Sequence, residues 1–211
     1  MLQQVTPVSR RVALGRAAAG ATALLAATWP AAILAKPATI HRPLLGSAAA
    51  PKRLILWGSL TCPYTAMLVD NLIGIQRDMP KVVAVEWHHF PTHPPDPALH
   101  VAALAFKGDQ FWRFATTVLG QIYAAGGSYD TLTPARIEEI ATSISGSPAS
   151  VRAALLNQAL WIVVRQDLIA GKLMRVSKTP GLFFNGYFLT PDGIPNDIKR
   201  FDLELRKMVA A

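Results

Sequence analysis

The chain has 211 residues, enough for one domain with a hydrophobic core and too few for a multidomain assembly. Hydrophobic residues make up 51% of it and charged residues only 16%, which excludes a mainly disordered chain. The 21 Lys and Arg outnumber the 13 Asp and Glu, giving a formal net charge of +8. No run of Lys or Arg, RNA-binding aromatic signature or zinc-finger spacing accompanies this charge, so we expect no nucleic-acid partner.

The first 35 residues are typical of a cleavable export signal. Arg10 and Arg11 precede residues 17–35, a stretch of 19 residues without a charge, ten of them Ala, and Pro30 breaks the helix near its end. A basic region, an apolar helix and a small residue at the cleavage point are the three parts of such signals. We therefore expect cleavage after Ala35 and a mature protein that is periplasmic or secreted.

Two features of this segment leave its export route and its fate open. The sequence Ser9-Arg10-Arg11-x-x-Leu14 resembles the core of the twin-arginine export signal, but Ala13 stands where that signal favours Phe, so the general secretion route stays an alternative. An uncleaved membrane anchor is the other alternative, since 19 uncharged residues can just span a bilayer core of about 30 Å. Ala gains little on transfer to lipid, which favours the cleaved signal. Only the anchor would bring the protein to a membrane.

The segment after the signal predicts a linker followed by a strand and a helix. Residues 36–51 are rich in Pro, Ala and Ser, so the folded domain is expected to begin at Lys52. The apolar run 53–58 ends at a glycine and predicts a buried strand. A helix is expected to start at Pro63, a residue favoured in the first helical turn, and to end before Pro80.

A second strand, a helical block and a hairpin are expected next. Residues 82–90 are rich in β-branched and aromatic residues and predict the strand. Apolar periodicity makes residues 98–171 helical, with Gly171 as the C-terminal cap of the last helix. Asn185-Gly186 between two apolar runs predicts a β-hairpin. The expected helices of the block are 98–106, 110–123, 133–144 and 147–170, the hairpin strands are 181–184 and 187–189, and an amphipathic helix over 197–208 ends the chain.

The order of these parts resembles the thioredoxin fold of the DsbA-like oxidoreductases over residues 53–211. Cys62-Pro63-Tyr64 at the start of a helix matches the beginning of that family's Cys-x-x-Cys, and Thr179-Pro180 matches its cis-Pro loop. The expected fold class is therefore α/β, a thioredoxin fold with a helical insertion between the second strand and the cis-Pro loop. The resemblance implies that Thr179 and Pro180 pair with a bound peptide beside the sulfur, and that Pro63 and Tyr64 border the same substrate site.

One departure from that family limits the chemistry. The second active-site cysteine of the family falls on Thr65, and Cys62 is the only cysteine in the chain. An intramolecular disulfide cannot form, so a dithiol oxidase cycle is excluded. A secreted protein with one cysteine is expected to pair between molecules or to keep a reactive thiol.

Cys62 and Thr65 are the candidate catalytic residues. The N–H groups and dipole of a helix N-terminus favour a thiolate, and the Thr65 hydroxyl, one turn on, is placed to donate to it. Such a thiolate attacks protein or peptide disulfides, and a substrate thiol or an external thiol such as glutathione then completes the exchange without a cofactor. The alternatives are that Cys62 is an inert buried residue and that Thr65 is an ordinary residue of the first helical turn.

Four histidines lie close together in the sequence, and we compared a metal site with ordinary surface positions for them. Neighbouring residues of a strand point to opposite faces, and several prolines extend the following loop, so a tetrahedral site with Cys62 is disfavoured. We expect surface and loop histidines and no bound metal. These residues are His88, His89, His93 and His100.

Two classes of function are compatible with the sequence, which favours no particular oligomeric state. The first is an exported monothiol thiol–disulfide oxidoreductase or isomerase-like protein. The second is a non-redox peptide-binding or chaperone module that keeps the groove of the fold while its catalytic pair has decayed. Fold alone does not decide between the two.

Overall fold

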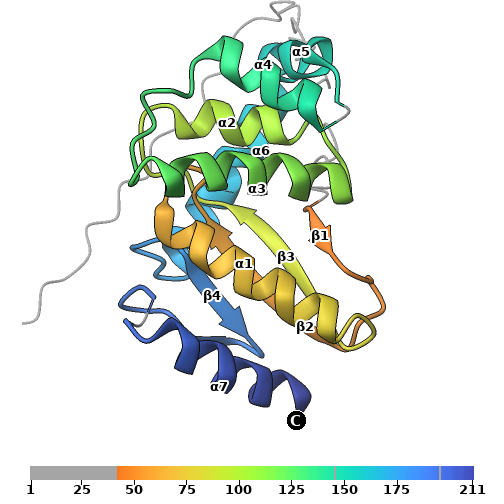
Figure 1. Cartoon of the computed structure of the whole chain (residues 1–211), viewed down its shortest axis with the longest axis vertical. Coiled ribbons are helices and arrows are strands. Elements are labelled where there is room, and N and C mark those ends of the chain that lie inside the picture. Colours follow the sequence, from red (N-terminus) through yellow and green to blue (C-terminus); the bar gives the residue numbers. More distant parts are fainter. Residues whose placement is uncertain (1–41, 145, 195) are drawn as a thin grey trace, which may run out of the picture. The chain divides into compact units, whose positions relative to one another are not determined.

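The computed structural model describes residues 42–144, 146–194 and 196–211. Both the predicted signal segment and the first part of the predicted linker, up to residue 41, lie outside these residues. In the described part the chain forms the expected mixed α/β fold (Figure 1). It has seven helices and five strands, one helix and one strand more than the sequence predicted. No helix there is long and apolar enough to cross a membrane.

The strands form one mixed sheet in the order β1-β3-β2-β4-β5. The central pair, β2 and β3, is parallel and is joined by helix α1, whereas β1, β4 and β5 are added in antiparallel pairings. The predicted hairpin is confirmed: Asn185 and Gly186 have φ angles of 49° and 79°, the positive values that a tight two-residue turn between strands requires. The strands are β1 (Leu44–Leu45), β2 (Lys52–Gly58), β3 (Val83–His89), β4 (Gly181–Phe184) and β5 (Tyr187–Phe188).

The start of the domain differs from the prediction. Leu44 and Leu45 lie in the segment expected to be a linker, yet they pair with Glu86 and Val85 of β3 as the edge strand β1. Leu45 also packs against the hydrophobic core. Backbone pairing and apolar burial at the sheet edge outweigh the Pro, Ala and Ser composition, so the folded domain begins before Lys52.

Five helices are inserted between β3 and β4, which confirms the expected helical block. Helices α2 to α5 gather at one end of the sheet in Figure 1, while α1 lies along the sheet. The first and last helices of the fold, α1 and α7, flank this insertion in the chain. The helices are α1 (Pro63–Asp78), α2 (Asp96–Ala103), α3 (Asp109–Ala124), α4 (Pro134–Ser143), α5 (Pro148–Leu156), α6 (Gln158–Leu173) and α7 (Ile198–Ala210).

Two details of the helical block correct the sequence analysis. The single helix expected over 147–170 is two helices, because Asn157 has non-helical backbone angles and its side chain caps α6 by accepting the N–H of Ala159. Gly171 is not a cap but lies inside α6, two residues before its end. A Cβ there would come within 2.6 Å of Trp57 and 2.7 Å of Phe90, so glycine is needed for close packing of α6 on the sheet.

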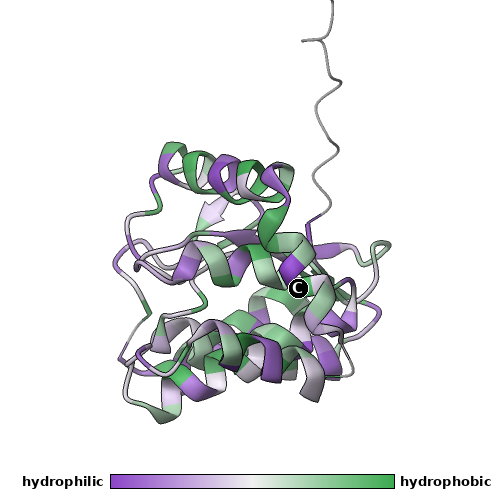
Figure 2. Ribbon diagram, turned by 90° about the horizontal axis from the view of Figure 1, so that it is seen from above, coloured by the Kyte–Doolittle hydropathy of each residue, from purple (hydrophilic) through white to green (hydrophobic). Residues whose placement is uncertain are grey.

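The sheet is apolar on both faces, which gives the molecule two layers of core. Leu54 and Leu56 of β2 belong to the larger cluster with α1, α3 and α7, whereas Trp57 and Phe183 form a second cluster with Phe90. Alternate residues of a strand point to opposite faces, so both sides of the central strands are buried. Helices in Figure 2 carry hydrophobic and hydrophilic positions in alternation, as expected for helices with one buried face.

Candidate active site

Cys62 lies at the junction between the sheet and α1. It occupies the N-cap position, with φ of −100° and ψ of 118°, and Pro63 is the first residue of the helix, as the sequence predicts. The side chain of Cys62 is only 7% exposed, although ligands of open α/β folds bind at this edge of the sheet. An incoming disulfide can therefore reach the sulfur only over a small accessible area.

The structure brings the predicted cis-Pro loop to this sulfur. The peptide bond between Thr179 and Pro180 is cis. The thiol of Cys62 donates to the backbone oxygen of Thr179 at 3.4 Å, so two candidate site residues that are 117 positions apart in the sequence are in contact. The loop therefore lies beside the sulfur, where the resemblance places it.

Thr190 holds the cis-Pro loop through two hydrogen bonds and was not among the predicted site residues. Its hydroxyl donates to the backbone oxygen of Pro180 at 2.8 Å and accepts the N–H of Leu182 at 2.9 Å. The side chain is 1% exposed, so both bonds are formed away from water. A lone threonine after a predicted hairpin carries no sequence signal for this role.

Tyr64 borders a pocket together with Thr179, the residue whose backbone oxygen contacts the Cys62 sulfur. Tyr64 is 58% exposed, and the pocket holds about 250 Å³ between it and the loop before α7. Pro63 lies on another side of the site, where the backbone of Gly127 comes close to its ring. The pocket is lined by Tyr64, Lys178, Thr179, Asp192, Gly193, Ile194 and Asn196.

Thr65 does not do what the sequence analysis expected. Its side chain is fully buried, and its hydroxyl oxygen has no hydrogen-bond partner among the described residues, Cys62 included. The hydroxyl therefore gives the sulfur no hydrogen bond in this structure. Thr65 is a buried residue of the first turn of α1, three positions after Cys62.

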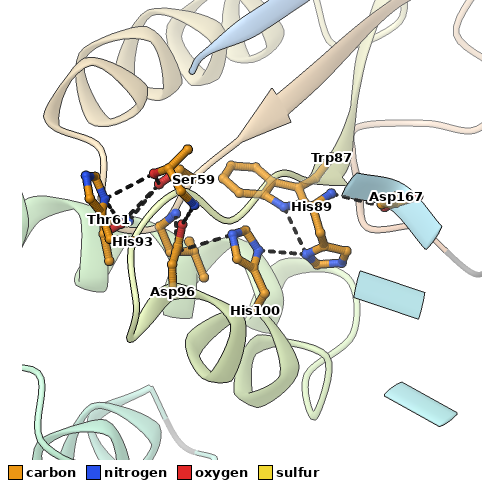
Figure 3. Close-up of polar contacts among 10 residues, drawn as sticks. Ser59, Thr61, Trp87, His89, His93, Asp96, His100 and Asp167 are labelled. Carbon is orange, nitrogen blue, oxygen red and sulfur yellow. Dashed lines mark hydrogen bonds and ion pairs between the residues drawn. The ribbon is translucent and has the colours of Figure 1, made fainter. Parts of the chain in front are cut away.

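The histidines differ from the surface positions expected for them. His88, His89 and His100 are 7%, 1% and 0% exposed, and of these four histidines His93 alone lies on the surface. His89 and His100 join through their Nδ1 atoms at 2.8 Å, and Trp87 donates to His89 at 3.3 Å (Figure 3). In the described part of the chain, no group of three or more His, Cys, Asp or Glu side chains could hold a metal ion.

Asp96 connects these histidines to the segment before Cys62. Its side chain is fully buried at the start of α2, with one carboxylate oxygen accepting the N–H of Leu60 at 3.0 Å and the other that of Thr92 at 2.8 Å. Burial alone would raise the pKa of this carboxyl, but the nearby His100 ring and the hydrogen bond from the N–H of Thr92 lower the pKa below its usual value. Asp96 was not among the predicted site residues, and only its Asp-Pro position at a helix start could have marked it.

Comparison with known proteins places this geometry in a family. The family model described as thioredoxin matches residues 38–201, a range that contains both Cys62 and the Thr179-Pro180 loop. The chain belongs to the thioredoxin family. The thioredoxin fold with a helical insertion, expected from the sequence, is thereby confirmed. None of the curated proteins compared with the chain matches it.

Solved structures similar to this thioredoxin-family chain share its fold at low sequence identity. Proteus mirabilis ScsC in a transitional conformation has 18% identity and a TM-score of 0.62, covering 80% of this chain and 73% of its own. A variant of Wolbachia pipientis alpha-DsbA1 has 17% identity and a TM-score of 0.63, covering 80% and 90%. A protein-disulfide isomerase from Novosphingobium aromaticivorans has 19% identity and a TM-score of 0.60, covering 78% and 97%.

Proposed function

We propose that this thioredoxin-family protein is an exported monothiol thiol–disulfide oxidoreductase or isomerase-like protein that acts through Cys62. The observation that carries the proposal is the position of its only cysteine, at the N-terminus of α1 and 3.4 Å from the backbone oxygen of Thr179 in a cis-Pro loop. The names of similar structures, among them a protein-disulfide isomerase, support the same class of reaction.

The first step is attack of the Cys62 thiolate on a disulfide of the substrate. A new sulfur–sulfur bond forms between Cys62 and one substrate sulfur, and the other substrate sulfur leaves as a thiolate. The backbone N–H groups at the start of α1 favour the negative charge on the attacking sulfur. No electrons enter or leave in this step, because one disulfide replaces another.

The second step needs a thiol from outside the chain. Thr65 occupies the place of a resolving cysteine and cannot break the mixed disulfide. A second thiol of the same substrate would attack the substrate sulfur and leave a rearranged disulfide, which is isomerisation. In reduction, one external thiol such as glutathione would attack the Cys62 sulfur and release the substrate with both of its sulfurs as thiols. A second glutathione would then attack the Cys62–glutathione disulfide, giving oxidised glutathione and the Cys62 thiolate. Both routes return Cys62 as a thiolate and need no cofactor.

The substrate contacts follow from the residues around the sulfur. The backbone of Thr179 and Pro180 is proposed to pair with an extended peptide, and Pro63 and Tyr64 to border it. The exposed ring of Tyr64 and the pocket of about 250 Å³ beside it offer room for one substrate group next to Thr179, which contacts the reacting sulfur. Protein or peptide thiols and disulfides are therefore the proposed partners.

One observation favours the alternative, a peptide-binding or chaperone module without redox activity. Cys62 is 7% exposed and its thiol hydrogen is used in the bond to Thr179, as in an inert buried cysteine. The peptide groove would then be the functional part, and the thiol would only fill space.

Mass spectrometry of the mature chain from Lys36 separates these two functions. Incubation with oxidised glutathione at neutral pH is expected to add one glutathione to the parent protein, and reduced glutathione should remove it. Cys62→Ser is the control and should gain nothing. If the folded parent protein stays unmodified but still suppresses the aggregation of a reduced client protein, the enzyme proposal is wrong and the peptide-binding module is the function.

A further inference from the structure

Asp96 holds two loops that meet beside the candidate active site. Its Oδ1 atom accepts the N–H of Leu60, and its Oδ2 atom accepts the N–H of Thr92. Leu60 belongs to the segment between β2 and Cys62, whereas Thr92 belongs to the loop between β3 and α2. Both N–H groups donate to one carboxylate that is 0% exposed, so the position of each loop depends on the other.

The segment held by Asp96 sets the start of α1. Leu60 lies two residues before Cys62 and is itself fully buried, and the N–H of Cys62 donates to the backbone oxygen of Ser59 at 3.4 Å. The hydroxyls of Ser59 and Thr61 add short bonds to Thr92 and His93 across the same two loops (Figure 3). A displacement of Leu60 would therefore move the N-cap residue that carries the sulfur.

The proton positions of the buried histidines follow from their partners. Trp87 Nε1 can only donate, so His89 Nδ1 accepts, and His100 Nδ1 must be the donor in the bond between the two rings. His100 Nε2 then faces Asp96 Oδ1 at 3.3 Å, as a close contact rather than an aligned hydrogen bond. The contact is an ion pair when both nitrogens of the His100 ring carry a proton.

We propose that the Asp96 carboxylate, balanced by the buried His100 ring, is the positioning residue for Cys62. The proposal rests on the function of Cys62 given above. A carboxylate is suited to this place because both of its oxygens accept, whereas an amide of the same shape has one acceptor and one donor. The negative charge is fully buried and would be unfavourable without a partner, and the His100 ring is the partner that faces it.

Asp96→Asn tests the proposal against a matched control. The variant must turn its amide nitrogen toward the N–H of Leu60 or of Thr92, so one of the two loops is released. Asp167→Asn is the control, because Asp167 is equally buried and also accepts a buried N–H, that of His89, at 3.0 Å. In the described part of the chain Asp167 makes no hydrogen bond to residues 59–62.

Two measurements are made on the parent and both variants, with the fraction folded determined for each. The rate at which Cys62 forms a mixed disulfide with oxidised glutathione is expected to fall about tenfold or more in Asp96→Asn, and to change little in Asp167→Asn. Amide NMR signals of Leu60, Thr92 and Cys62 should shift and exchange faster with solvent in Asp96→Asn, whereas Asp167→Asn should move the signal of His89.

The outcomes separate this proposal from the proposed function. Equal rates and unmoved Leu60 and Cys62 signals in Asp96→Asn would overturn the positioning role. If Cys62 of the parent does not react at all, the proposed function fails, and the amide signals still decide whether Asp96 holds the segment. If Asp96→Asn does not fold, His100→Gln replaces it in both measurements. The rate of mixed-disulfide formation is then expected to fall less, with the same amide signals shifted. An unchanged rate and an unchanged spectrum would overturn the proposal.

Discussion

The sulfur of Cys62 lies 3.4 Å from the backbone oxygen of Thr179, and the thiol is the donor in this contact. A thiolate has no hydrogen to donate, so ionisation of Cys62 leaves the Thr179 oxygen in need of another donor. The backbone N–H of a bound peptide is such a donor, and it would arrive together with the disulfide to be attacked. Loss of the thiol hydrogen and binding of a peptide at the cis-Pro loop are therefore expected to favour each other.

Thr65→Cys should restore the missing dithiol. Position 65 lies on the first turn of α1 after Cys62, and its hydroxyl has no hydrogen-bond partner among the described residues, so replacing it breaks no bond. A disulfide between the two cysteines is expected to form under mild oxidant, and mixed disulfides with a peptide thiol should become transient. Free thiols are counted after oxidation, and oxidation of a reduced peptide is followed against the parent and Cys62→Ser.

Thr65→Val is the matched control for that variant, because it keeps the shape of threonine and removes only the hydroxyl. Its stability should be equal to or higher than that of the parent, and its exchange rate unchanged. A slower exchange in Thr65→Val would mean that the hydroxyl does assist the sulfur. Two thiols that stay free in Thr65→Cys would mean that positions 62 and 65 do not face each other.

Thr190→Val should loosen the cis-Pro loop. Valine keeps the branched shape but leaves the N–H of Leu182 and the oxygen of Pro180 without their buried partner, at a cost of about 1–3 kcal/mol in the free energy of unfolding. Urea unfolding measures the change. Thr142→Val, at an exposed helical position where the hydroxyl only returns to its own helix, is expected to change stability little. Equal effects of the two substitutions would contradict the role given to Thr190.

Gly171→Ala should destabilise the packing of α6 on the sheet. The added methyl would lie within 2.6 Å of Trp57, and overpacking of this kind typically lowers the free energy of unfolding by about 1–3 kcal/mol. Gly120→Ala is the control, since nothing lies within 4 Å of its Cβ and alanine is the better helix former. Thermal unfolding should therefore move down for the first variant and up for the second, and a stabilised Gly171→Ala would refute the packing argument.

The folded state should lose stability in acid. The hydrogen bond from His88 lowers the pKa of Glu86 from 4.5 to about 2, with a further contribution from Arg53 against the opposing effect of burial. A group with a lowered pKa stabilises the fold above its unfolded value, and this contribution is lost as pH falls from 4.5 toward about 2. The pKa of Asp96 is also lowered, so it acts in the same direction.

His89 adds to this loss at milder pH. Burial, followed by the charge of His100, lowers the pKa of His89 well below 6.5. As pH falls below 6.5, His89 is therefore protonated in the unfolded chain but stays neutral in the folded one. Stability should therefore begin to fall below pH 6.5 and fall further below pH 4.5. The urea midpoint measured between pH 7 and pH 3 checks this, with Glu86→Gln expected to flatten the lower part of the curve. A midpoint independent of pH would exclude both contributions.

Export is expected to depend on the first 35 residues. Mass spectrometry of the protein from its own cell should find a mature start near Lys36, because residues 1–35 have the parts of a cleavable signal. Replacing Arg10 and Arg11 together by Lys should block export by the twin-arginine route, which reads the arginine pair rather than its charge. Unchanged export of that variant would indicate the general secretion route, and full-length chain found only in the cytosol would contradict export.

The local parts of the fold could be predicted from the sequence because neighbouring residues determine them. Pro63 after Cys62 places the cysteine at a helix start, and Asn185-Gly186 produces the positive φ angles of the hairpin. The order of motifs was enough to expect Thr179-Pro180 beside the sulfur. Apolar periodicity could not predict that the helix expected over 147–170 is divided at Asn157. The apolar pattern continues on both sides of Asn157, and only its side-chain cap starts a new helix there.

Tertiary structure decided the parts that depend on burial and on contacts between distant residues. Periodicity does not reveal that His89 and His100 meet in the core, or that Asp96 reaches the N–H of Leu60 across 36 positions. The sequence alone determined that one cysteine stands at a helix start without a partner for an internal disulfide. The packing of α2 and β3 decided that the Asp96 carboxylate holds the segment before Cys62. A carboxylate is stable in a core only where donors and an opposite charge surround it.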